Sequence, residues 1–206
     1  MELTVEDNDA LTELLNIGYG RAAGALAELT GYRIVLEVPN VGIHNIEAIG
    51  PELQRAINAE AVSVHQAFSG VVSGTALVVL DRTSALTLVD LLNERTERPE
   101  DFDLNANETI TEVGNIVLNA TLGVFANLLK IRMNFHVPLL RIDSSPNIVA
   151  TIANGSTEMP WHGLMIHTRF TVKTNSVTGY MVIILGTSSL DRLLNEVRTW
   201  GRQVLE

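Results

Sequence analysis

The sequence contains no cysteine, which excludes a disulfide framework and thiolate metal sites and fits a reducing compartment. It is also short of basic residues, with 14 lysines and arginines against 24 aspartates and glutamates, for a formal net charge of −10. Such a charge opposes nonspecific attraction to nucleic acid or anionic lipid and favours a partner with a basic surface. The sequence has neither a basic start followed by an apolar run nor a stretch of about 18 uninterrupted apolar residues. We therefore expect a soluble cytoplasmic protein that binds no nucleic acid and does not insert into a membrane.

Hydrophobic residues make up 46% of the 206 residues, which is enough to form a core. The segment 18–24 (GYGRAAG) resembles a glycine-rich nucleotide loop, but such a loop follows a buried strand, and residues 1–8 are short and largely polar. The segment instead has helical periodicity, with an apolar stripe made of Leu11, Leu14, Leu15, Gly18, Ala22, Ala25 and Leu29. We predict a helix that begins after Asp7 or Asn8 and ends at Gly31.

Two polar residues, Glu13 and Asn16, lie on the face of this predicted helix opposite the apolar stripe. The same face continues through small residues only, namely Gly20, Ala23, Gly24 and Ala27. A glycine inside a helix costs up to about 1 kcal/mol relative to alanine, so its presence indicates close packing or a surface that stays flat. A flat surface would let another protein approach closely. Taken alone, however, the two residues are more simply explained as a solvated polar face.

An internal repeat gives the pair more weight. The segment 9–17 (DALTELLNI) matches 108–116 (ETITEVGNI), so that Glu13 corresponds to Glu112 and Asn16 to Asn115, each 99 residues apart. The same register continues without a gap to a proline in each half, Pro39 and Pro138. Gly18 and Gly20 correspond to Val117 and Asn119, so the second copy lacks the nucleotide-loop pattern but keeps Glu-x-x-Asn.

The two halves also share an order of elements. Each predicted helix is followed by a strand-like run into a proline, an irregular stretch, two β-rich runs and a closing helix. We predict strands at 33–39, 61–68 and 75–80 and at 131–138, 164–173 and 180–185, with closing helices at 84–94 and 188–204. Residues 94–107 are polar and connect the halves. The expected fold is one α+β domain over residues 1–206, made of two repeats (about 1–95 and 105–206) related by a pseudo-two-fold axis, with two three-stranded layers giving a mostly antiparallel sheet packed with long helices.

The repeated spacing resembles the signature of a known family. Asp9-x3-Glu13-x2-Asn16-x22-Pro39, and its second copy from Glu108 to Pro138, is similar to the pattern of the CheC phosphatases of chemotaxis, relatives of CheX and of the flagellar switch protein FliY. The resemblance covers essentially the whole chain, and two copies with the same distant proline make it specific. Glu108 departs from the family pattern, which usually has aspartate or serine there.

The resemblance implies that the protein hydrolyses the aspartyl phosphate of the response regulator CheY. Asn16 and Asn115 would each position a water, and Glu13 and Glu112 would each pair with a lysine of the receiver domain. It implies no cofactor bound by this chain, because the receiver carries its own Mg²⁺, and it implies CheD as a second partner. A chain with its own two-fold repeat has less need to dimerise, so we expect a monomer.

Two other function classes stay open. One is a module without catalysis, either an adaptor that binds CheY or CheD or a flagellar-switch protein similar to FliM; intact Glu/Asn pairs, and the absence after residue 206 of the C-terminal domain that FliM and FliY carry, argue against the switch protein. The other is an unrelated duplicated enzyme for small molecules, which would require a concave site. A convex helix face does not supply one.

The remaining polar and aromatic residues give weaker signals. The five histidines show no paired ligand spacing with carboxylates, and we expect no metal site. We expect Trp161 and Trp200 to pack in or beside the core, and 144–146 (SSP) to form a turn. The last predicted helix should carry a solvated face made of Arg192, Glu196, Arg198 and Arg202.

Overall fold

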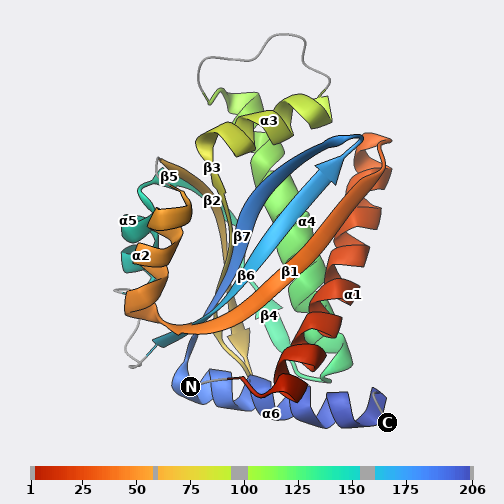
Figure 1. Cartoon of the computed structure of the whole chain (residues 1–206), viewed down its shortest axis with the longest axis vertical. Coiled ribbons are helices and arrows are strands. Elements are labelled where there is room, and N and C mark those ends of the chain that lie inside the picture. Colours follow the sequence, from red (N-terminus) through yellow and green to blue (C-terminus); the bar gives the residue numbers. More distant parts are fainter. Residues whose placement is uncertain (1–2, 58–59, 94–101, 154–160, 205–206) are drawn as a thin grey trace.

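The structure is a computed structural model, and it describes residues 3–57, 60–93, 102–153 and 161–204. Six helices and seven strands are present in these ranges (Figure 1). In chain order they are α1 (Val5–Thr30), β1 (Ile34–Asn45), α2 (Ile46–Ala56), β2 (Ala61–Gly70), β3 (Gly74–Asp81), α3 (Arg82–Asn93), α4 (Leu104–Leu128), β4 (Met133–Phe135), β5 (Leu139–Asp143), α5 (Ser145–Ala153), β6 (Trp161–Val172), β7 (Asn175–Gly186) and α6 (Thr187–Val204).

All seven strands belong to one sheet, and every strand pairing in the described residues is antiparallel. The order is β1-β6-β7-β3-β2-β4, and β5 pairs with β2 next to β4. The hairpins β2–β3 and β6–β7 meet at the centre through β3 and β7. The first strand of each repeat crosses to the hairpin of the other repeat, so β1 pairs with β6, and β4 and β5 pair with β2.

The predicted α+β class with an antiparallel sheet and long helices is confirmed, and the pairing β3–β7 lies where a pseudo-two-fold axis would pass. The predicted strand runs lie in one continuous sheet, but the sequence did not indicate that the first strand of each repeat joins the hairpin of the other. A strand exposes hydrogen-bonding groups along its edges, and exchange of the first strands closes both hairpins into one continuous sheet. No local sequence pattern specifies which hairpin a distant strand joins.

The helices cover both faces of the sheet. Helices α1 and α4 lie side by side on one face, α2 and α5 on the other, and α3 and α6 lie at opposite ends of the molecule (Figure 1). The larger hydrophobic core lies under α1 and α4, and the smaller one lies under α2 and α5. Helices α2 and α5 were not predicted from the sequence, and they occupy the stretches expected to be irregular. Gly50-Pro51 in α2 and Ser145-Pro146 at the start of α5 are typical of turns. Pro146 lies in the first turn of α5, where proline is tolerated, whereas Pro51 lies inside α2; both helices bury one apolar side.

Helices α1 and α4 run antiparallel, side by side (Figure 1). Gly18 of α1 lies against Thr121 of α4. A β-carbon at Gly18 would lie 2.9 Å from the Cα of Thr121, so glycine at this position permits the close crossing. At Gly20 and Gly24, by contrast, an added β-carbon would meet no atom within 4 Å, and both residues are exposed. Close packing therefore explains Gly18, while the other two glycines leave the outer surface flat.

The boundaries of the long helices differ from those predicted. Helix α1 begins at Val5 after the N-cap Thr4, three or four residues earlier than expected, because Thr4 and Asp7 form a capping box. The buried stripe also ends earlier, since Ala25 and Leu29 are exposed. Helix α4 begins at Leu104 with Asp103 as N-cap, inside the expected polar connector, of which residues 94–101 lie outside the described ranges.

Helix α4 is the one helix in the described ranges that is long and apolar enough to cross a membrane. Half of its most apolar window is buried inside the protein. Its buried side packs against α1 and the sheet, as in the core helix of a globular domain.

Candidate functional site

The first site consists of Glu13 and Asn16 on α1. Both residues are exposed, and they lie one helical turn apart on the side of α1 that faces away from the core. Among the described residues, neither side chain has a hydrogen-bond or ion-pair partner. The next exposed position on this side is Gly20, which adds no side chain. The first site is therefore a carboxylate and a carboxamide that are both free to meet a partner.

The second site consists of Glu112 and Asn115 on α4, the positions that the repeat predicts. Glu112 is exposed and Asn115 is half-buried. The Nδ2 of Asn115 lies 3.5 Å from the Oε2 of Glu112, at the long limit of a hydrogen bond. Asn119, one turn further along α4, donates from its Nδ2 to the Oδ1 of Asn115. The second site thus has a carboxamide with defined hydrogen-bond partners.

Asn119 accepts a hydrogen bond from Gln66, a residue of strand β2 whose side chain is only 2% exposed. The Nε2 of Gln66 donates to the Oδ1 of Asn119 at 3.0 Å and to the backbone oxygen of His136 at 3.1 Å. His136 lies between β4 and β5, beside Pro138, which has no N–H to continue the strand pairing. The interruption leaves the carbonyl of His136 available to a side chain.

The sequence analysis did not identify Gln66 or Asn119 as part of a site. A signal for Asn119 was present, because an asparagine stands four residues after Asn115 where the first copy has Gly20. Gln66 gives no such signal, since only the folded sheet brings β2 against α4.

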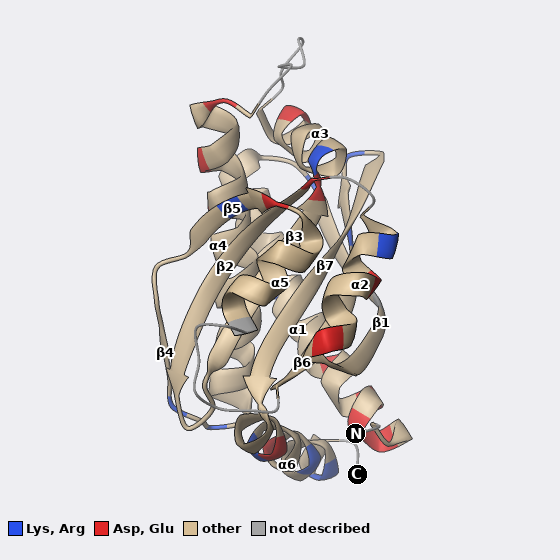
Figure 2. Ribbon diagram, turned by 90° about the vertical axis from the view of Figure 1, so that its left-hand side faces the viewer, with Lys and Arg blue, Asp and Glu red and all other residues tan. Residues whose placement is uncertain are grey.

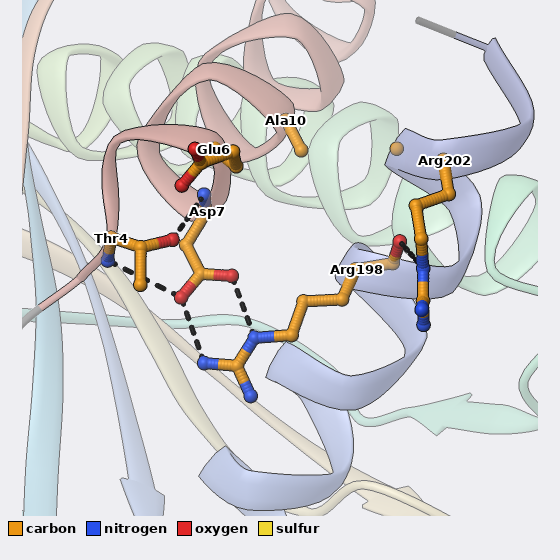
Figure 3. Close-up of a pocket in the computed structure, with 7 residues that line it drawn as sticks. Thr4, Glu6, Asp7, Ala10, Arg198 and Arg202 are labelled. Carbon is orange, nitrogen blue, oxygen red and sulfur yellow. Dashed lines mark hydrogen bonds and ion pairs between the residues drawn. The ribbon is translucent and has the colours of Figure 1, made fainter. Parts of the chain in front are cut away.

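The first turn of α1 is fixed to the last helix. The carboxylate of Asp7, which is 1% exposed, accepts hydrogen bonds from the Nε and Nη2 of Arg198, each at 2.7 Å, and from the backbone N–H of Thr4 (Figure 3). The Arg198 guanidinium lowers the pKa of Asp7, and the carboxylate raises the pKa of Arg198. These residues line a hollow of about 400 Å³ together with Glu6, Ala10, Gly201 and Arg202. Acidic residues of α1 and basic residues of α6 lie at the same end of the molecule (Figure 2).

Arg192, Arg198 and Arg202 of α6 are exposed, as predicted for a solvated face, but Arg198 also pairs with the buried carboxylate of Asp7. Arg192 also has a partner, the backbone oxygen of Val71. Trp161 and Trp200 are each 8% exposed and pack in the two cores, as predicted. Ser145 begins α5 instead of forming a turn. Within the described ranges there is no cluster of three or more histidine and acidic side chains that could hold a metal ion.

Comparison with known proteins finds chemotaxis and flagellar proteins that are similar to this chain. No protein-family model matches the sequence. The sequence is 22% identical over 170 residues to the CheY-P phosphatase CheC of Bacillus subtilis, covering 79% of each chain. The fold is similar to that of Thermotoga maritima FliY, with a TM-score of 0.77, 19% identity and coverage of 98% of this chain and 99% of the other.

The comparisons support the assignment of the chain to the CheC/CheX/FliY family, and the likeness to the solved structures shows its fold. The FliM middle domain from H. pylori also has this fold, with a TM-score of 0.65, 11% identity and coverage of 94% of this chain and 99% of the other. Proteins with different names therefore share this fold. The comparisons do not show whether this chain has a catalytic or an adaptor function.

Proposed function

We propose that this protein is a cytoplasmic phosphatase that hydrolyses the aspartyl phosphate of the chemotaxis response regulator CheY. The observation that carries the proposal is the repeated Glu-x-x-Asn pair on the outer sides of α1 and α4, where a partner domain can reach both sites. The name of the Bacillus subtilis relative, CheY-P phosphatase CheC, supports the same activity.

The chemistry requires little from the helper protein. An aspartyl phosphate is an activated acyl phosphate, and the receiver domain supplies Mg²⁺, so this chain would need neither a metal nor a covalent nucleophile. A water oxygen attacks the phosphorus in line, the bond from phosphorus to the aspartyl oxygen breaks, and the products are a free aspartate carboxylate and inorganic phosphate. Asn16 and Asn115 would orient this water, since a carboxamide donates and accepts hydrogen bonds without a charge that repels the phosphoryl group.

Glu13 and Glu112 would hold the receiver in place. A carboxylate next to the docked phosphoryl group would be repelled by it, but one helical turn away it can pair with a lysine of the receiver. The exposed backbone at Gly20 and Gly24 leaves room for that approach beside the first site. We expect Glu13→Gln or Glu112→Gln to raise KM more than it lowers kcat. Each change removes the carboxylate that would pair with the receiver lysine but keeps the asparagine that would orient the water.

The test is the rate of phosphate loss from the CheY proteins of the same organism, phosphorylated with acetyl phosphate and freed of the donor. The variants are Asn16→Ala, Asn115→Ala and the double variant, with Asn127→Ala, an exposed asparagine on α4 outside both sites, as a matched control. We expect the wild type and the control variant to accelerate phosphate loss from CheY. The double variant should not accelerate it. A wild type that binds phosphorylated CheY without accelerating the decay would contradict the proposal.

A non-catalytic adaptor or switch module is the second candidate, and the fold shared with FliY and the FliM middle domain favours it. An adaptor would bind CheY or CheD with no change in the rate of phosphate loss. Substitution of both Asn16 and Asn115 would then leave the adaptor's activity unchanged in a reconstituted chemotaxis pathway. Calorimetric binding to each partner, run beside the decay assay, separates the two candidates.

A further inference from the structure

The hydrogen bonds at the second site form a chain. The donor and acceptor roles along it are fixed by its buried end, at Gln66. A backbone carbonyl only accepts, so the oxygen of His136 requires Gln66 to present its Nε2. The same Nε2 donates to Asn119, which must accept with its Oδ1 and therefore turns its own Nδ2 toward Asn115. Asn115 then accepts with its Oδ1 and directs its Nδ2 to Glu112. We call Gln66, Asn119 and Asn115 the amide chain.

The amide chain leaves Asn115 with the capacity that its proposed role requires. Its Oδ1 has a second lone pair, and its Nδ2 has a second N–H, so the carboxamide retains one acceptor and one donor position for a water. Without neighbours, a carboxamide rotates about its last torsion and can exchange its oxygen and nitrogen positions. The buried end of the chain at Gln66 opposes that exchange.

The first repeat lacks both supporting amides. Asn119 corresponds to Gly20 in the sequence repeat. Phe68 pairs with Phe135 and Leu36 with Phe170, which places Thr168 at the position equivalent to Gln66; Thr168 has no amide, and its hydroxyl is hydrogen-bonded to that of Tyr19. Asn16 accordingly has no hydrogen-bond partner among the described residues. The two sites thus carry the same Glu-x-x-Asn motif but differ in how firmly the asparagine is held.

We propose that Asn119 and Gln66 are positioning residues that orient the Asn115 carboxamide and make the second site the faster of the two. This inference rests on the proposed phosphatase function. A carboxamide that is oriented before the water binds lowers the free-energy cost of reaching the reactive geometry. It should therefore raise kcat and leave the affinity for CheY unchanged. The first site would still act, at a lower rate, through a carboxamide that must be ordered in each turnover.

The kinetic test isolates the second site by use of the Asn16→Ala background. There, Asn119→Ala should lower kcat about tenfold with less than a twofold change in KM, as expected for loss of one orienting hydrogen bond. Asn119→Asp has the same size but cannot donate to Asn115, and it should cause a similar loss. In the Asn115→Ala background, which leaves only the first site, the Asn119→Ala change should have no effect. An unchanged kcat for the second site would overturn the positioning role while leaving the phosphatase function intact.

A second measurement does not depend on activity. In ¹⁵N relaxation spectra, the side-chain NH₂ group of Asn115 should be ordered and that of Asn16 mobile, and Asn119→Ala should make Asn115 as mobile as Asn16. The inference is overturned if the two groups are equally mobile in the wild type, or if Asn119→Ala leaves the Asn115 signal unchanged. A wild type that fails to accelerate phosphate loss but shows the ordered Asn115 group would refute the phosphatase function alone.

Discussion

The ion pair between Asp7 and Arg198 joins residues 191 apart in the sequence and makes a quantitative prediction. Arg198→Met keeps much of the side-chain stem but removes the guanidinium. The Asp7 carboxylate, 1% exposed, would then keep only hydrogen bonds within the cap at Thr4. Hydrogen bonds to charged groups contribute about 1.5–3 kcal/mol each. Since the Arg198 side chain is 45% exposed and water replaces part of its effect, we expect the free energy of unfolding to fall by about 2–3 kcal/mol in total.

Urea unfolding followed by circular dichroism measures this loss, with Asp7→Asn and the double variant completing a thermodynamic cycle. The pKa of Asp7 is lowered in the folded state, so the pair contributes stability above the ordinary carboxyl pKa and loses it as pH falls through the lowered folded-state pKa. The difference between wild type and Arg198→Met should therefore shrink below about pH 4. A difference under about 0.5 kcal/mol at neutral pH, or one that does not change in acid, would refute the reasoning.

Two further predictions concern packing and acid stability. Gly18→Ala should destabilise by about 1–3 kcal/mol, because its β-carbon would lie 2.9 Å from the Cα of Thr121, whereas Gly24→Ala, with no atom within 4 Å, should stabilise by up to about 1 kcal/mol. Effects of the same sign in urea unfolding would contradict the close helix crossing. Burial lowers the pKa of His65 to about 4, so the unfolded chain takes up a proton first and stability should fall as pH decreases from about 6.5 to about 4. His65→Gln can keep the hydrogen bond to Ser63, and its stability should vary less in this pH window; an equal pH dependence would exclude His65 as the cause.

The features that follow from local pattern could be predicted from the sequence. Helical periodicity placed Glu13 and Asn16 on the outer side of α1, and the 99-residue repeat placed Glu112 and Asn115 at the equivalent positions of α4. The repeat also led to the antiparallel α+β fold. In each case the relevant residues lie within a few turns of one another or are copied between the halves.

The features that depend on distant pairing could not be predicted. The exchange of β1 onto the hairpin of the other repeat, and the bond from Arg198 to Asp7, both require knowledge of the assembled fold. The same is true of the contact between Gln66 and Asn119, which come from different repeats. Helix α2 was missed for another reason, because Gly50-Pro51 favours a turn locally and tertiary packing overrides it.

The rate of aspartyl-phosphate loss from CheY, in the presence of the wild type and of the Asn16→Ala/Asn115→Ala double variant, tests the central claim most directly. The measurement is made at a concentration at which both proteins bind CheY equally, so that only the water-orienting residues differ. We predict that the wild type accelerates the loss and that the double variant leaves it at the intrinsic rate of CheY. Equal rates with the two proteins would contradict catalysis by the paired asparagines.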